Sequence, residues 1–314
     1  MNNALKITAF AAALAATFGT AYGVGRGVDP LVASEGRPAA QHGGHGGEGE
    51  EDAAPQAADH VPGGLQVSEN GYALALRTPT LRAGARGEIR FAVKDDTGRK
   101  VTAYQREHGK ELHLILASTD LTQYRHLHPV RAADGTWSAP VELPEAGGYR
   151  VFADFTPAGK KAGNLTLGAD LAVSGAYRPA ALPAPAAVAE VDGYRVVLDG
   201  GLRAGQAGEL KPSISRNGRP VTDLEPYLGA YGHLVALRSG DLAYLHVHPN
   251  EGGPGPVVPF TATAPSAGTY RLFLDFKHGG EVHTAAFTVR VAPAAQDGGE
   301  HGGSGVGTPA GHAH

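Results

Sequence analysis

Three histidines near the middle of the chain have the spacing of a metal site. His126 and His128 lie two residues apart in a predicted strand, and His113 lies in the predicted strand before it. Side chains two apart on a strand share a face, so these two imidazoles point the same way, with Cα atoms about 7 Å apart. A hairpin turning about residues 120–121 would place His113 opposite His128, on that same face, and Ile115 opposite His126. Three neutral imidazoles with an open fourth position suit Zn(II) or Cu(II).

The same pattern occurs a second time further along the chain. His233, His246 and His248 repeat the spacing of the first trio, which predicts a second metal site. His278 and His283 flank the last predicted hairpin of this copy, where the first copy has no histidine. If that hairpin lies near the HxH strand, these two residues would add ligands. We therefore expect the second site to bind more tightly.

Carboxylates and tyrosines also recur in both copies. Asp154 and Asp275 each precede a phenylalanine and could orient an imidazole from the outer shell, although a surface or turn-capping role is favoured. Tyr124 and Tyr244 precede the HxH pairs by two residues, a position that favours packing. For the histidines themselves a structural role without a metal also stays open, since an HxH pair can simply line a polar sheet face.

The composition limits which ligands are available. The chain has no cysteine and its single methionine is Met1, which excludes disulfides, thiolate zinc sites, iron–sulfur clusters and blue-copper centres. A metal must therefore be held by imidazole, carboxylate or backbone oxygen. The formal net charge of -4 gives no electrostatic case for a nucleic-acid partner. The motifs of a serine nucleophile elbow, a phosphate-binding loop and a zinc protease are absent, so we expect no enzyme.

The elements that must position these side chains are short strands in two copies of one domain. The matching segments are Leu81–Ile89 with Leu202–Leu210, His113–Pro129 with His233–Pro249, and Tyr149–Phe155 with Tyr270–Phe276. Each copy is predicted to hold about seven short strands separated by Gly, Pro, Asp and Asn, a pattern typical of an immunoglobulin-like sandwich. The predicted fold class is all-β, with two tandem immunoglobulin-like β-sandwich domains.

Composition also predicts the boundaries of these domains. An apolar stretch over residues 7–24 follows Lys6, which is typical of an export signal and is long enough for a membrane anchor. Polar, Gly-rich ends cannot bury enough surface to order themselves, and their histidines could bind metal loosely. The predicted segments are 1–30 signal peptide or anchor, 31–64 disordered His- and acid-rich spacer, 65–175 first sandwich, 176–189 Pro/Ala linker, 190–292 second sandwich, and 293–314 disordered His/Gly-rich tail.

Several runs resemble a known group of proteins. HLIL, YRHLHP, GTW, GGYRVFADF and TLGADLAV resemble actinobacterial exported tandem immunoglobulin-like proteins, and the second copy is similar to YtkA-like domains. The resemblance covers about residues 65–292. It implies export, an immunoglobulin-like fold and a link to heavy-metal binding.

Together these patterns predict an extracytoplasmic protein, secreted or membrane-anchored, that binds Cu(II) or Zn(II) for metal buffering or delivery. A membrane metal transporter is the expected delivery partner. Neutral imidazole is the ligand, so binding should weaken below about pH 6.5. Two alternatives stay open. One is a non-catalytic cell-surface adhesion or scaffold module, and the other is a copper redox enzyme, because His246-Val247-His248 resembles the paired copper ligands of Cu,Zn superoxide dismutases.

Overall fold

A computed structural model describes residues 61–159, 163–245 and 247–294. All of these residues belong to one compact unit. The predicted signal or anchor, nearly all of the spacer and all but two residues of the tail lie outside the described residues. Within the described part, no helix is long and apolar enough to cross a membrane.

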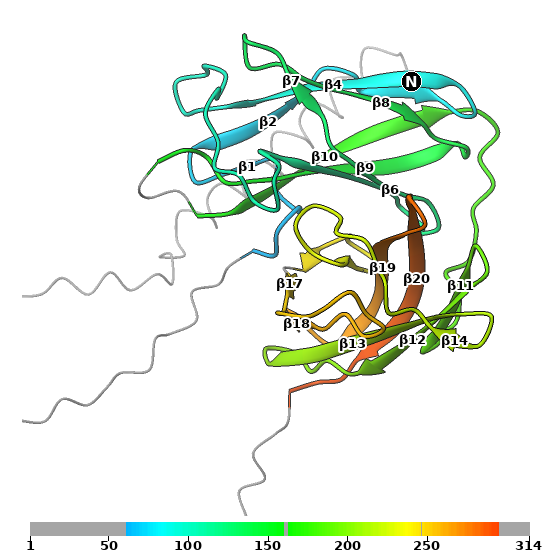
Figure 1. Cartoon of the computed structure of the whole chain (residues 1–314). Helices are drawn as coiled ribbons and strands as arrows, with labels where there is room; N and C mark the ends of the chain where they lie inside the picture. Colours follow the sequence, from blue (N-terminus) through cyan, green and yellow to red (C-terminus); the bar gives the residue numbers. More distant parts are fainter. Residues whose placement is uncertain (1–60, 160–162, 246, 295–314) are drawn as a thin grey trace, which may run out of the picture. The chain divides into compact units, whose positions relative to one another are not determined.

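The first sandwich consists of two five-stranded sheets (Figure 1). The strands are β1 Ser68–Glu69, β2 Tyr72–Leu76, β3 Thr80–Arg82, β4 Arg86–Lys94, β5 His113–Ser118, β6 Tyr124–Leu127, β7 Val130–Arg131, β8 Trp137–Glu142, β9 Gly147–Phe155 and β10 Leu165–Ser174. One sheet has the order β1-β2-β4-β8-β7 and the other β3-β10-β9-β5-β6. Only β3 runs parallel to its neighbour among these described pairs.

The second sandwich repeats this plan. The strands are β11 Val188–Val191, β12 Tyr194–Gly200, β13 Ala207–Arg216, β14 Arg219–Pro220, β15 His233–Arg238, β16 Tyr244–Leu245, β17 Val247–Pro249, β18 Phe260–Thr263, β19 Gly268–His278 and β20 Glu281–Val291. One sheet has the order β11-β12-β13-β18-β17, with β14 beside β13, and the other β16-β15-β19-β20. The chain is therefore two tandem immunoglobulin-like β-sandwiches, which confirms the predicted fold class.

Strand β5 is buried throughout because its two faces belong to two different cores. Leu114 and Leu116 pack inside the first sandwich, among side chains from both of its sheets. Ile115 and Ala117 face the other way and join a separate buried cluster. Alternate side chains of a strand point to opposite faces, so a continuous apolar run indicates burial on both sides. Strand β15 divides its side chains between the second core and the same shared cluster.

That shared cluster joins the two sandwiches. It contains Ile115, Ala117, Leu121, Tyr124 and Phe152 of the first sandwich with Val235, Leu237, Leu242 and Phe273 of the second. The rings of Tyr124 and Phe273 stack with centroids 4.1 Å apart. The Pro/Ala segment is also held against both sandwiches, since Ala180 N–H donates to Asp120 and Ala186 N–H to the Thr288 carbonyl. The sandwiches therefore dock directly and are not merely tethered by a linker.

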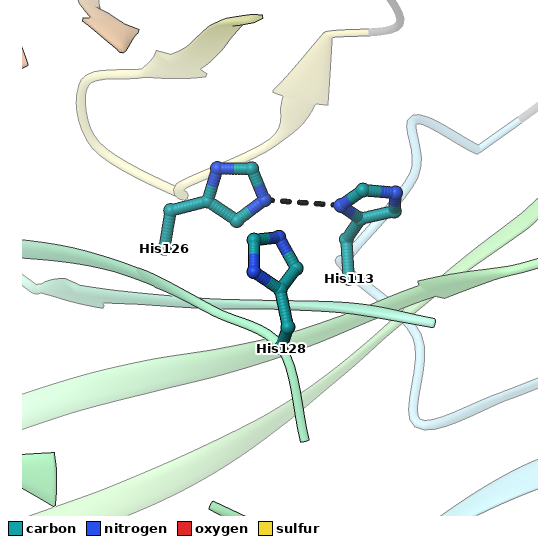
Figure 2. Close-up of side chains that lie close together, drawn as sticks. All are labelled: His113, His126 and His128. Carbon is teal, nitrogen blue, oxygen red and sulfur yellow. Dashed lines mark hydrogen bonds between the residues drawn. The ribbon is translucent and has the colours of Figure 1, made fainter. Parts of the chain in front are cut away.

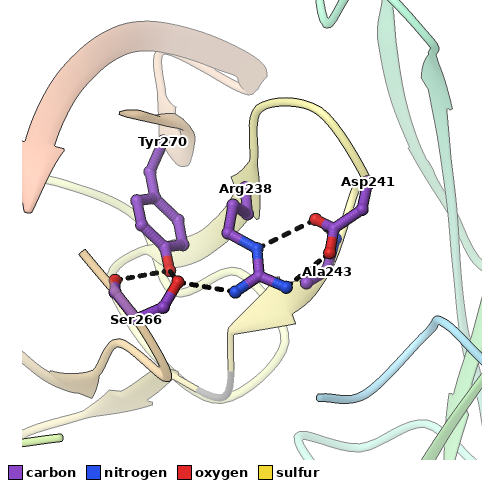
Figure 3. A network of polar contacts seen from close by, with 5 residues as sticks. All are labelled: Arg238, Asp241, Ala243, Ser266 and Tyr270. Carbon is purple, nitrogen blue, oxygen red and sulfur yellow. Dashed lines mark hydrogen bonds and ion pairs between the residues drawn. The ribbon is translucent and has the colours of Figure 1, made fainter. Parts of the chain in front are cut away.

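An aspartate fixes the turn after β5 and after β15, and so sets the register of the strand that follows. Asp120 accepts from Ser118 Oγ at 2.5 Å and from Thr122 N–H at 3.2 Å. In the second copy Asp241 accepts from the Arg238 guanidinium and from Ala243 N–H at 3.1 Å, as Figure 3 shows. Such local bonds from aspartate to the backbone favour a tight turn over a continued strand.

Truncating Phe273 tests whether the sandwiches dock in solution. Phe273 is buried against Tyr124, so Phe273→Ala should lower the free energy of unfolding by about 3–5 kcal/mol, measured by urea denaturation. The half-exposed Val282 on β20 supplies the control, since Val282→Ala should change the free energy of unfolding by less than about 0.5 kcal/mol. Equal effects of the two substitutions would contradict a buried interface.

Candidate metal centre

The first histidine trio comes together as the sequence predicts. Strands β5 and β6 pair in the expected register, with Ile115 opposite His126. One ring nitrogen from each of His113, His126 and His128 lies within 4.8 Å of the others. Figure 2 shows the three rings lying close together, with a dashed line for the hydrogen bond between His113 and His126.

The spacing of the three rings matches that of imidazoles on one ion. The ring centroids are 5.3 Å apart for His113 and His126, 5.4 Å for His113 and His128, and 4.9 Å for His126 and His128. A zinc–nitrogen bond places the ring centre about 3.2 Å from the metal, so two imidazoles at a tetrahedral angle have centroids about 5.2 Å apart. The ring positions are therefore compatible with three imidazoles on one metal ion.

The hydrogen bonds outside the trio fix where two of the lone pairs point. His113 Nε2 donates to the Glu107 carbonyl at 3.3 Å, and His126 Nδ1 donates to Asp275 Oδ2 at 2.9 Å. A carbonyl and a carboxylate only accept, so the other nitrogen of each neutral ring carries a lone pair. Those nitrogens, His113 Nδ1 and His126 Nε2, face each other at 3.1 Å. Either His113 gives up its bond to Glu107 and donates from Nδ1 to His126, or a proton or a metal ion lies between the two lone pairs.

Burial disfavours an extra proton between His113 and His126. Desolvation, reinforced by the neighbouring His126, lowers the pKa of His113 from 6.5 to about 3. Desolvation first, and His126 second, also lower the pKa of His128 from 6.5 to about 3. Both rings are therefore neutral at physiological pH, which is the form that binds metal. The buried Nε2 of His128 has no hydrogen-bond partner among the described residues, so a third nitrogen is also available.

The carboxylate that orients His126 comes from the second sandwich. Asp275 is only 2% exposed and also accepts from Thr284 Oγ1 at 2.6 Å and from the Tyr124 hydroxyl at 3.3 Å. The favoured prediction of a surface or turn-capping role for Asp275 is therefore wrong, because β19 faces the other sandwich and not solvent. Its counterpart Asp154 accepts from Asn164 Nδ2 at 2.9 Å and is partly buried.

The second trio departs from the predicted pairing at His248. Strands β15 and β16 pair in the expected register, but β16 ends at Leu245. The chain then passes to the other sheet, where His248 pairs with Thr261 on β18 and not with His233. In the first copy the matching change of sheet comes only after His128. His246 lies outside the described residues, so its role as a ligand stays a prediction.

His283 does not join His233 because the two face opposite sides of one sheet. His233 is opposite Asp275 on β19, and Asp275 is opposite Thr284 on β20, so these three share a face. His283 is opposite Phe276 and shares the other face, which belongs to the second core. A shift of one residue is enough to send a side chain to the far side.

His278 likewise lies away from His233, in a polar group at the end of β19. Its Nδ1 contacts the Tyr194 hydroxyl at 2.6 Å and its Nε2 contacts Asp223 at 3.1 Å. Nearby, His283 Nδ1 donates to Asp192 at 2.8 Å. Both histidines have partners, and the prediction that they add ligands to the second trio is wrong.

His233 instead lines the same cavity as His113 and His126 of the first trio. This cavity has a volume of 120 Å³ and is also lined by His108, His113, His126, His248, Glu107 and Asp154. Desolvation lowers the pKa of His233 from 6.5 to about 4. Sequence reasoning missed His108, which lies in an irregular loop; only its alignment with Leu228 in the second copy could have marked it as unusual.

The buried neutral histidines should make the metal-free protein sensitive to acid. In the unfolded chain they protonate below about pH 6.5, whereas His113 and His128 stay neutral in the folded chain down to about pH 3. The free energy of unfolding should therefore decrease as the pH is lowered through this window, by about 1.4 kcal/mol per pH unit for each histidine. Urea denaturation with a chelator present measures this slope. His113→Leu should flatten it, and an unchanged slope in that variant would contradict the buried neutral site.

Comparison with known proteins gives a family but no activity. The sequence has no match among curated proteins. Similar solved structures include a DUF4426 family protein from Pseudomonas aeruginosa PAO1, with a TM-score of 0.27 and 13% identity over 34% of this chain and 98% of that one. They also include the Escherichia coli adhesin FdeC, with a TM-score of 0.23 and 20% identity over 73% of this chain and 65% of that one. Yersinia pseudotuberculosis InvD has a TM-score of 0.25 and 12% identity over 77% of this chain and 62% of that one.

At these TM-scores the likeness carries no argument about function. A family match is more informative, because it covers both sandwiches and most of the chain. It extends over residues 66–166 and again over residues 189–293. The chain therefore belongs to the family described as domain of unknown function DUF8832, and carries two copies of its domain.

Proposed function

We propose that this protein binds a divalent metal ion at His113, His126 and His128. The observation that carries the proposal is the lone-pair contact between His113 Nδ1 and His126 Nε2, 3.1 Å apart, with both outer nitrogens committed to acceptors. A metal ion between these nitrogens would let both outer hydrogen bonds persist without placing an extra proton on a buried ring. The third nitrogen, from His128, lies within 4.8 Å of both.

The ligand set favours Zn(II) or Cu(II). Imidazole suits both ions, and the chain has neither cysteine nor an internal methionine to favour Cu(I). The Asp275 carboxylate behind His126 resembles the outer-shell partner that commonly orients a metal-bound histidine. It also supplies one negative charge against the ion. Three nitrogens leave a coordination position open, which suits an ion that is exchanged more than one that is sealed in.

An exchangeable ion fits metal buffering or delivery. The apolar N-terminal stretch supports an extracytoplasmic location, and a membrane metal transporter would be a partner for delivery. The copper redox alternative draws on His246 and His248, of which His248 pairs with Thr261 in the sheet that does not contain His233.

Metal titration of the full chain tests the proposal. By calorimetry the wild-type protein should bind one Zn(II) or Cu(II) more tightly than the His126→Ala/His128→Ala double variant, which keeps only loose binding by the histidine-rich ends. His278→Asn is the control, because it removes an imidazole held by Tyr194 and Asp223. If the double variant binds as tightly as the wild type, the proposed site is wrong.

Removing the charge of Asp275 should weaken the site without deleting a ligand. Asp275→Asn should lower metal affinity about 10–100-fold, because the carboxylate sets the tautomer and raises the basicity of His126. Asp192→Asn makes the same change in a histidine–carboxylate pair elsewhere, that with His283, and should leave metal affinity unchanged. A matching loss in both variants would point to general destabilisation instead.

The adhesion or scaffold alternative makes a different prediction for partners. If the sandwiches serve only as a contact surface, binding to a partner should be the same with and without chelator. Metal delivery requires instead that partner binding or metal transfer depend on the loaded site. Testing a candidate partner against the wild type and the His126→Ala/His128→Ala variant separates the two.

A further inference from the structure

An exposed histidine, His108, lies at the edge of the cavity that His113 and His126 line. His108 is exposed, on the loop between β4 and β5, yet it lines the same 120 Å³ cavity as His113 and His126. It also lines a second, more open cavity of 490 Å³, beside Tyr231 and Asn250. His108 therefore stands between the outer cavity and the buried trio.

His233 lies between His108 and the trio. Its Nε2 donates to the Tyr227 carbonyl at 2.8 Å, which leaves the lone pair on Nδ1, as in His113. The ring centroid of His233 is 5.2 Å from that of His108. It is 6.3 Å from that of His113 and 6.1 Å from that of His126. The imidazoles thus form a continuous series from the exposed loop to the trio.

The ring-centroid distances distinguish a site that holds the ion at equilibrium from a site that the ion only passes through. Two imidazoles on one tetrahedral ion have centroids about 5.2 Å apart, a spacing that His108 and His233 meet. The wider spacing of His233 to the trio is too large for a fourth ligand of the resting ion, but it is short enough for an ion to pass from one set of nitrogens to the next. We propose that His108 and His233 form a transit site through which the ion passes between the outer cavity and the trio.

The fold does not require a histidine at position 108. The equivalent turn of the second sandwich has Leu228, and the two residues share a positive φ, 49° for His108 and 55° for Leu228. The turns also close in the same way, with bridges from Glu107 to Lys110 and from Tyr227 to Ala230. His108→Leu should therefore preserve the turn and remove only the imidazole.

The inference rests on the proposed metal site and is tested by kinetics. Uptake and release of Zn(II) by the full chain are followed by stopped flow with a chromophoric chelator. Signal from the histidine-rich ends is subtracted with the His126→Ala/His128→Ala variant. A transit site lowers the barrier in both directions, so His108→Leu should slow uptake and release by the same factor and leave the equilibrium affinity unchanged. A barrier higher by about 1.4 kcal/mol would slow each about tenfold.

Gln105→Leu is the matched control. Gln105 is exposed on the same loop, is neutral, and lines neither cavity, so this variant should exchange metal at the wild-type rate. Wild-type rates in His108→Leu would overturn the transit site while leaving the trio intact. If His108→Leu instead weakens the affinity and speeds release without slowing uptake, His108 is a ligand of the ion bound at the trio. That result also overturns the transit site. If the wild-type chain shows no trio-dependent binding, the proposed function itself fails.

Discussion

The hydrogen bond from His126 to Asp275 is the interaction on which the site depends. It joins the two sandwiches at 2.9 Å, and both side chains are almost fully buried. A buried carboxylate is costly unless its oxygens are paired, and Asp275 is paired with Thr284 and Tyr124 as well. Because Asp275 can only accept, it fixes the proton of His126 on Nδ1 and turns the lone pair of Nε2 toward His113. The first sandwich supplies the three proposed ligands, and Asp275 of the second sandwich fixes the tautomer of His126.

Docking of the sandwiches is therefore part of the proposed site. The stack of Tyr124 on Phe273 and the apolar side chains around it hold β19 against β6 at the distance the hydrogen bond needs. Duplication of the domain has produced two copies that face each other through equivalent strands, β5 and β15. As a result His113 and His233 line one cavity, where the repeat alone suggested two separate sites.

The alternation of side chains along each strand, together with the turn residues, was enough to predict the fold class and the first trio. Alternation along β5 and β6, with a short turn at Asp120, determines the pairing of Ile115 with His126. The second trio follows the same pattern, but local pattern does not show where a strand leaves one sheet for the other. The change after Leu245 depends on which sheet the next residues can pair with. The side to which His283 points depends on the β19–β20 register, and the burial of Asp275 depends on a partner sheet far away in sequence.

Nitrogen-15 NMR of the histidine side chains tests the central claim most directly. In the metal-free protein the account predicts protons on His113 Nε2 and His126 Nδ1. One equivalent of Zn(II) should then shift the signals of His113 Nδ1, His126 Nε2 and one nitrogen of His128. The contradicting result is a shared proton between His113 and His126 that Zn(II) does not displace, with shifts confined to histidines of the chain ends.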